Sequence, residues 1–313
     1  MRHAVWLLLL FPVAVPARAP APRVDHHQHL MNPAMVESPA QAIDAQLLIS
    51  RLDDAGIRRA VLLSNAFAWG NPRPTPLENE YERVKAENDW TLQQAAPYSQ
   101  RLAVFCSFNP LRDYALAELE RCAADPAFGR GIKLQFAASD VNLDDEADLA
   151  RVRRVFEAAN AKRLALVVHM RTRRAKPYGA AQAQAFIDKL LSAAPDVPVQ
   201  VAHFTGGANP DDTPADEALG AFIEAIRRKD PRVKNLYFDL ALVFDAKTTP
   251  ERRQWLAQRM REIGVERILY GTDGGDPTDP PPKAQLEAFR KLPLTAEEFR
   301  VIDANVAPYL RQP

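Results

Sequence analysis

The chain of 313 residues is long enough for one large domain or two ordinary ones. Its 40 basic and 40 acidic residues cancel, so the charge gives no reason to expect a nucleic-acid or membrane-surface partner. Apolar residues make up 47% of the composition, which supports a large globular core.

Residues 1–19 have the pattern of a signal peptide. Arg2 gives a short positive start, residues 4–15 form an apolar run, and small residues and prolines follow. The run is shorter than the roughly 20 apolar residues that a membrane-spanning helix needs. A buried first helix is the alternative, but Pro12 and Pro16 would break it. We therefore expect cleavage, at a point that the sequence leaves open, and a periplasmic or secreted mature chain without a membrane span.

Residues 22–313 alternate between short apolar runs and amphipathic stretches, with no visible boundary to a second domain. The runs are rich in Val, Ile and Leu, as strands buried on both faces are. The expected strands are residues 22–30, 57–66, 101–108, 129–136, 164–170, 197–204, 235–242 and 267–273. The stretches between them have apolar residues at three- and four-residue spacing, and these predict helices at residues 45–56, 114–125, 149–162, 183–194, 219–229 and 252–264.

Eight strands alternating with helices predict a single-domain (β/α)8 TIM barrel. A doubly wound open sheet is the alternative. It is less favoured because no glycine-rich phosphate-binding turn follows the first strand.

Two cysteines follow one another closely in this pattern. Cys106 lies in the third expected strand and Cys122 in the helix after it. In an exported protein they could form a disulfide, but two buried thiols are an equal alternative.

Histidines and one aspartate fall at the ends of the expected strands. His27 and His29 end the first strand, His169 the fifth and His203 the sixth, and Asp273 ends the eighth. Each of these alone is a weak signal, because a single histidine at a strand end is usually a hydrogen-bonded surface or core residue. Together they lie at the end of the barrel where active sites occur, and imidazole with carboxylate suits zinc, manganese or iron. The pattern predicts a metal site in which a bound water becomes acidic and Asp273 accepts its proton.

The alternation of side chains along a strand decides which residues of the first strand reach the ion. Asp25, His27 and His29 are expected on one face. His26 is expected on the outer face, away from the metal.

The arrangement DxHxH on the first strand, histidines on strands five and six, and aspartate on strand eight resembles the amidohydrolase superfamily. The segments YSQRLAVFCSFNPLRDYALAELERC, FGRGIKLQF, HFTGG, ILYGTD and ANVAPYL are similar to its amidohydrolase 2 branch, which includes aminocarboxymuconate-semialdehyde decarboxylase, related decarboxylases and lactone hydrolases. The resemblance implies four metal ligands, which are His27, His29, His169 and Asp273. It also implies that His203 acts as a base or electrophile toward the substrate, or as a ligand if a second ion is present.

The resemblance also bears on the number of ions. In binuclear members a lysine of the fourth strand is carbamylated and bridges two metals, whereas this branch often carries the lysine without that use. Lys133 occupies that position. We favour one divalent ion, with zinc expected and manganese or iron as alternatives, and we expect Lys133 to line the substrate pocket.

The loop after the fifth strand suggests an anionic substrate. Arg171 is in phase with His169 and could hold a carboxylate in a bidentate way. Phe67, Trp69 and Phe244 lie in loops that could wall the pocket.

Three functions remain open from the sequence. The first is hydrolysis of an ester, lactone or amide bond in a small, carboxylate-bearing molecule. The second is nonoxidative decarboxylation with the same metal, and the third is a non-catalytic barrel that binds a metal or ligand. A homo-oligomer is compatible with each of them.

Overall fold

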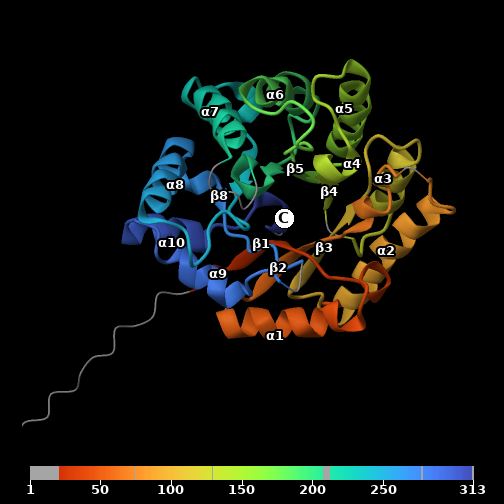
Figure 1. The fold of residues 1–313 in the computed structure, drawn as a ribbon, viewed down its shortest axis with the longest axis horizontal. Coiled ribbons are helices and arrows are strands. Elements are labelled where there is room, and N and C mark those ends of the chain that lie inside the picture. Colours follow the sequence, from red (N-terminus) through yellow and green to blue (C-terminus); the bar gives the residue numbers. More distant parts are fainter. Residues whose placement is uncertain (1–20, 74, 129, 207–211, 276–277, 312–313) are drawn as a thin grey trace, which may run out of the picture.

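The computed structural model describes residues 21–311, except for residues 74, 129, 207–211 and 276–277. Its eight parallel strands form one sheet in chain order, β1 to β8, and helices surround it (Figure 1). The predicted (β/α)8 barrel is confirmed. The doubly wound alternative is excluded, because that fold places later strands on both sides of β1. The expected signal peptide, residues 1–19, lies outside the described residues. Among the helices that are described, none is long and apolar enough to cross a membrane.

Each strand falls inside a predicted apolar run. The strands are β1 Val24–Gln28, β2 Arg59–Leu63, β3 Leu102–Ser107, β4 Gly131–Gln135, β5 Ala165–His169, β6 Val199–Val201, β7 Leu236–Asp239 and β8 Ile268–Leu269. The barrel closes through the residues after β8. The N–H of His26 donates to the carbonyl of Tyr270 at 2.8 Å, and the N–H of Asp273 donates to the carbonyl of His27 at 2.8 Å.

Several of the helices begin at a residue whose side chain caps them. The helices are α1 Ala45–Ala55, α2 Glu80–Ala95, α3 Ala115–Ala124, α4 Phe136–Ser139, α5 Glu146–Ala161, α6 Ala180–Ala185, α7 Thr213–Arg227, α8 Pro250–Ile263, α9 Pro282–Phe289 and α10 Ala296–Ala304. In α1, for example, the side chain of Asp44 accepts a hydrogen bond from the N–H of Leu47, and Gly56 ends the helix with φ of 75°.

Two apolar clusters hold the barrel together. The larger one fills the space between the strands and the helices. The smaller one fills the barrel interior and consists of Val24, Val61, Leu63, Phe105, Ala165, Val167 and Leu310. Leu310 comes from the C-terminal segment, which thereby plugs one end of the barrel. Gly131 of β4 is required there, because a Cβ at this position would lie 2.0 Å from Cε2 of Phe105.

A β-bulge in β1 changes the predicted faces of this strand. Asp25 pairs with Ala60 but Gln28 with Leu62, so β1 has one extra residue in this interval. The side chains of Asp25 and Gln28 therefore meet, with Nε2 of Gln28 donating to Oδ2 of Asp25 at 2.8 Å. The prediction that Asp25 shares a face with the metal-binding histidines is wrong, because strict alternation does not hold across a bulge.

The prediction for His26 is wrong for the same reason. His26 is fully buried, and its ring contacts the C-terminal segment instead of the helices outside the sheet. Its Nδ1 lies 3.0 Å from the carbonyl oxygen of Tyr270, and the N–H of Ala307 donates to its Nε2 at 3.2 Å. Its ring is edge-on to Tyr309 in the C-terminal plug. His26 thus anchors that plug to β1.

Of the two alternatives for the cysteines, the structure has the disulfide. Cys106 of β3 is bonded to Cys122 of α3, with 6.3 Å between the Cα atoms. The bond ties a strand of the barrel to the helix that covers it.

Candidate metal centre

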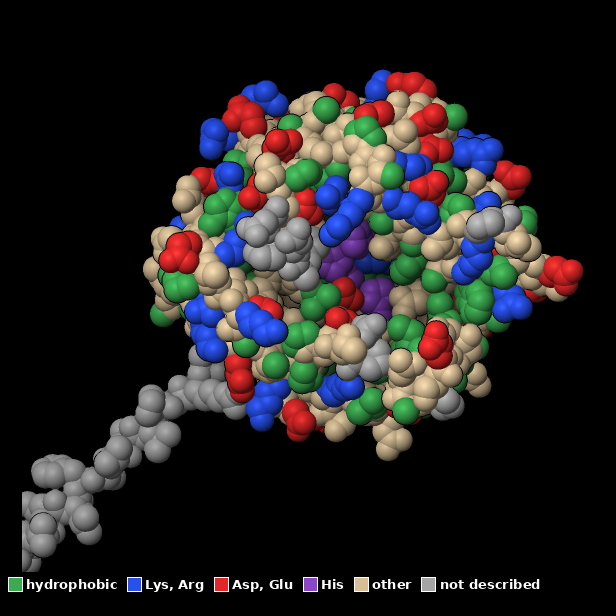
Figure 2. Space-filling model, in the orientation of Figure 1, with side chains coloured by type: hydrophobic (Ala, Val, Ile, Leu, Met, Phe, Trp, Pro, Cys, Tyr) green, Lys and Arg blue, Asp and Glu red, His purple; other side chains and the backbone are tan. Residues whose placement is uncertain are grey.

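The C-terminal ends of the strands open onto a pocket of about 550 Å³. Figure 2 shows histidine side chains inside this hollow. The lining residues are His29, Met31, Met35, Asn65, Phe67, Ala68, Lys133, Gln135, His169, His203, Asp273, Gly275 and Asp279. Barrel enzymes carry their active sites at this end, so the pocket is the candidate functional site.

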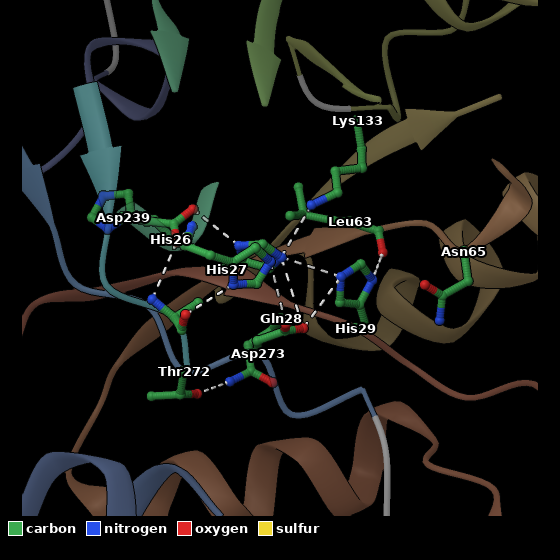
Figure 3. A network of polar contacts seen from close by, with 12 residues as sticks. His26, His27, Gln28, His29, Leu63, Asn65, Lys133, Asp239, Thr272 and Asp273 are labelled. Atoms are coloured by element: carbon green, nitrogen blue, oxygen red, sulfur yellow. Dashed lines mark hydrogen bonds and ion pairs between the residues drawn. The ribbon is translucent and has the colours of Figure 1, made fainter. Parts of the chain in front are cut away.

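His27 of β1, His29 just beyond its end and the aspartate that follows β8 bring their ligand atoms together (Figure 3). Nε2 of His27 lies 3.3 Å from Nε2 of His29 and 3.7 Å from Oδ1 of Asp273. Nε2 of His29 lies 3.4 Å from the same oxygen. The other oxygen of Asp273 lies 3.6 Å from Nε2 of His203.

The remaining ring nitrogens decide which lone pairs face the pocket. In three histidines Nδ1 lies against an oxygen that carries no proton, so Nδ1 must be the donor. The pairs are His27 with Asp239 at 3.0 Å, His29 with the carbonyl of Leu63 at 2.5 Å, and His203 with the carbonyl of Ala241 at 2.8 Å. In a neutral imidazole this leaves an Nε2 lone pair, and all three lone pairs are directed toward the carboxylate of Asp273. Such a set needs a cation among its members. Nζ of Lys133 lies beside Nε2 of His27, at 3.1 Å, and a divalent metal ion would serve the set as a whole, so these residues fit one.

The backbone around Asp273 is arranged to hold this geometry. Asp273 itself has φ of 55°, a left-handed conformation that is uncommon outside glycine. The glycines that follow permit a close approach of β1. A Cβ at Gly275 would lie 2.9 Å from Cβ of His29, and one at Gly274 would lie 3.0 Å from Oε1 of Gln28.

His203 lies in a turn rather than in a strand. The prediction of a sixth strand through residues 197–204 is too long, because β6 ends at Val201. From His203 to Thr205 the backbone is left-handed, with φ of 54°, 53° and 75°. This turn directs His203 back over the barrel mouth. Unusual backbone of this kind is concentrated at functional sites.

His169, the predicted third ligand, ends β5 and lines the same pocket. Its ring centroid is 4.7 Å from that of His203. His27, His29 and Asp273 each offer a ligand atom within 4.8 Å of the other two, and His169 is not a member of this group. His169 therefore lies beside this group and on the wall of the same pocket.

Asp239, at the end of β7, is a site residue that the sequence analysis missed. It is fully buried and accepts hydrogen bonds from Nδ1 of His27 at 3.0 Å, from Nε2 of Gln200 at 2.7 Å and from the N–H of His203 at 3.0 Å. It thereby orients two histidines of the site. An aspartate inside the apolar run NLYFDLAL was the available signal.

Burial and charge set the protonation states of these groups. Burial lowers the pKa of His29 to about 3 and lowers the pKa values of His169 and His203. Burial alone would raise the pKa of Asp273, but the surrounding histidines and Lys133 hold it well below its usual range. His29, His169 and His203 are therefore neutral near pH 7 and Asp273 is ionised, and these are the forms that bind metals.

Lys133 lies on the floor of the pocket. Its Nζ is 3.1 Å from Nε2 of His27 (Figure 3), and the side chain is almost fully buried. Burial lowers the pKa of Lys133 to about 8. The position agrees with the predicted pocket-lining role.

Arg171 is not among the residues that line the pocket. Its guanidinium forms two hydrogen bonds with Asp212, at 3.0 and 3.1 Å, and lies over the ring of Tyr178 at 4.5 Å. The structure thus gives Arg171 a partner within the chain in place of a substrate carboxylate. Of the predicted aromatic walls, Phe67 lines the pocket and Phe244 lines a neighbouring one.

The fold and the site together define a (β/α)8 barrel with a histidine and aspartate cluster suited to a divalent cation. A family model described as amidohydrolase (Amidohydro_2) matches residues 24–302, and the chain belongs to this family. No curated protein matches the chain.

Several solved structures share the fold at low sequence identity. The 5-carboxyvanillate decarboxylase of Sphingomonas paucimobilis has a TM-score of 0.62 and 16% identity, over 90% of this chain and 96% of that one. A dihydroxybenzoic acid decarboxylase of Polaromonas, described with bound manganese and the inhibitor 2-nitroresorcinol, has a TM-score of 0.61 and 17% identity over 91% and 95%. A probable 2-pyrone-4,6-dicarboxylic acid hydrolase of Acinetobacter baumannii has a TM-score of 0.58 and 16% identity over 89% and 95%.

Proposed function

We propose that this protein is a metal-dependent hydrolase that cleaves an ester, lactone or amide bond in a small, carboxylate-bearing molecule. The observation that carries the proposal is the convergence of three Nε2 lone pairs, from His27, His29 and His203, on the carboxylate of Asp273. The probable pyrone dicarboxylate hydrolase, which has the same fold, supports this reaction class.

The residues present fit the ion that the family implies. We propose that His27, His29 and Asp273 hold the ion and that His169, which lines the same pocket, is the fourth ligand. The ion would supply a Lewis acid that polarises the substrate carbonyl and makes water more acidic. The ionised carboxylate of Asp273 then takes the proton of the attacking water and returns it to the leaving oxygen or nitrogen. Nε2 of His203 lies 3.6 Å from Oδ2 of Asp273, where it would accept a hydrogen bond from the attacking water or the substrate and orient that group.

Lys133 supplies the positive charge in this scheme. Its ammonium group is directed at the pocket floor, beside His27. There it donates to a carboxylate of the substrate or to the oxygen on which negative charge develops. Asn65 and Gln135, which also line the pocket, offer neutral hydrogen bonds to the rest of the molecule.

Nonoxidative decarboxylation is the second candidate. Similarity of the fold to two aromatic acid decarboxylases favours it. In that reaction Lys133 and the cation would hold the acid while a proton is delivered to carbon.

We propose one ion per chain and zinc as its identity, with manganese or iron as alternatives. The manganese described in the Polaromonas decarboxylase supports manganese. Elemental analysis of the purified protein tests this. About one equivalent is expected, and two equivalents would instead favour a binuclear site with carbamylated Lys133.

Product analysis separates the two reactions. The metal-loaded protein is incubated with a panel of lactones, esters, amides and aromatic acids, and both acid release and carbon dioxide are measured. Asp273→Asn should abolish turnover, whereas Asp113→Asn, at a side chain that is 99% exposed, should not. Release of carbon dioxide without release of acid would mean that the reaction is decarboxylation and not hydrolysis. No turnover on any substrate, with metal bound, would favour a non-catalytic binding barrel.

We also propose that the protein is exported. The signal-peptide pattern of residues 1–19 supports this, and so does the disulfide between Cys106 and Cys122. Fractionation of cells that express the full chain tests it. Recovery of the uncleaved chain from the cytoplasm would contradict it.

A further inference from the structure

A second pocket adjoins the catalytic pocket, and no residue role proposed above involves it. It has a volume of about 680 Å³ and lies between the loop after β7, the start of α8 and the start of α9. Asp279 lines both pockets, so a molecule bound in one lies close to the other. None of the proposed metal ligands lines the second pocket.

A buried glutamine in this pocket lacks hydrogen-bond partners. Gln285 of α9 is 2% exposed, yet neither its amide oxygen nor its amide nitrogen has a partner among the described residues. Nε of Arg252 is likewise buried without an acceptor. Buried polar groups are almost always paired, so an unpaired amide of this kind indicates a missing partner. A ligand that donates to Oε1 and accepts from Nε2 of Gln285 would supply it.

The rest of the lining narrows the chemistry of that ligand. Phe244 and Trp255 contribute aromatic surface, and the guanidinium of Arg252 lies 3.8 Å from the ring centroid of Trp255. Asp245 and Glu251 add negative charge at the wall, and Lys247 and Arg252 add positive charge, so the lining has no single sign of charge. A carboxylate is disfavoured at Gln285, because it has no proton to donate to Oε1. A neutral amide on an apolar or aromatic frame can donate to Oε1 and accept from Nε2.

We propose that this pocket binds a neutral aromatic carboxamide or lactam. Because the pocket adjoins the catalytic one through Asp279, the bound group is the distal part of the substrate. This second step rests on the proposed function, whereas the binding of the amide does not.

Two tryptophans make the proposal testable by nuclear magnetic resonance. Trp255 lines the second pocket. Trp69 directly follows the short helix Ala66–Ala68, whose Phe67 and Ala68 line the catalytic pocket. Protein labelled with nitrogen-15 in tryptophan is titrated with benzamide, without added metal, and Trp255→Phe identifies the indole signal of Trp255. Benzamide should shift the signal of Trp255 and leave that of Trp69 unchanged.

Two comparisons give the specificity. Benzoate should bind the wild-type protein at least about tenfold more weakly than benzamide, because benzoate has no N–H to donate to Oε1 of Gln285. Gln285→Leu should weaken benzamide binding by a similar factor, while Gln258→Leu, at an exposed glutamine of α8, should not change it.

The proposal would be overturned by a shift of Trp69 alone, by equal binding of benzoate and benzamide, or by unchanged benzamide affinity in a folded Gln285→Leu variant. The comparison of the two ligands needs no variant, so it stands even if Gln285→Leu does not fold. Turnover is not measured in this titration. If the hydrolase proposal fails, the result of the titration still stands. If the titration fails, the hydrolase proposal is unaffected.

Discussion

Replacing Asp239 with asparagine would test whether this carboxylate sets the tautomer of His27. Oδ2 of Asp239 accepts from Nδ1 of His27 and Nε2 of Gln200, at 3.0 and 2.7 Å. Oδ1 accepts from the backbone N–H groups of His203 and Ala241, at 3.0 and 3.1 Å. Asparagine offers one oxygen and one NH2 group, so one of these two pairs of donors must face another donor.

The two backbone donors are fixed by the turn after β6 and the end of β7, so the amide oxygen should remain with them. The NH2 group then faces Nδ1 of His27, which can accept a hydrogen bond only if its proton moves to Nε2. That proton would block the lone pair directed at His29 and Asp273. Loss of such a partner behind a metal-binding histidine typically weakens metal affinity about 10- to 100-fold, or about 1.4 to 2.7 kcal/mol.

The assay is competition for zinc and for manganese between the protein and a chromophoric chelator. Nitrogen-15 chemical shifts of labelled histidine report the tautomer of His27 in the metal-free protein. Asp113→Asn serves as the matched control at an exposed carboxylate. A folded Asp239→Asn protein with wild-type metal affinity and an unchanged His27 tautomer would refute the reasoning.

Three further predictions concern stability. Burial lowers the pKa of His26 to about 4 from 6.5, so the unfolded chain binds the proton first. The free energy of unfolding should therefore fall by up to about 3 kcal/mol as the pH drops from 6.5 to 4. His26→Asn should make the free energy of unfolding, measured by denaturant titration, less dependent on pH in that range, and an unchanged pH dependence would contradict the assignment. Breaking the bond between Cys106 and Cys122, which are 16 residues apart, should cost about 3 kcal/mol, and dithiothreitol should destabilise the wild type but not the double alanine variant. Arg171→Ala should lower the free energy of unfolding by about 1 to 3 kcal/mol and leave KM unchanged, because the guanidinium of Arg171 is paired with Asp212. A rise in KM for carboxylate substrates alone would instead support the predicted binding of a substrate carboxylate by Arg171.

The barrel could be predicted because its signals are local and repeated. Each strand is an apolar run and each helix has an apolar stripe, so the order of elements follows from periodicity alone. The candidate ligands could be predicted for a related reason. In a parallel barrel all strands end at one rim, so His27, His169 and Asp273 are brought together by topology without knowledge of any contact.

Contacts that depend on departures from regular structure could not be predicted. The bulge in β1 inserts one residue, and alternation therefore fails for Asp25 and His26. The left-handed residues of the turn at His203 are not glycines, so the sequence does not indicate this turn. Arg171 was assigned to the pocket from its phase with His169, but phase says nothing of Asp212, a residue some 40 positions away that is within hydrogen-bonding distance only in the folded chain.

The bulge also explains why polar groups are tolerated in the interior of this barrel. It allows β1 to anchor the C-terminal plug through His26 and the candidate metal site through His27. A chain of hydrogen bonds connects these two ends. The hydroxyl of Tyr309 donates to Oε1 of Gln200 at 2.5 Å. Nε2 of Gln200 donates to Asp239, which accepts from Nδ1 of His27. A buried chain with every one of these contacts made costs little and fixes orientation, whereas a broken one leaves unpaired groups in a low-dielectric interior. The C-terminal segment is therefore coupled to the orientation of a candidate metal ligand at the opposite end of the barrel.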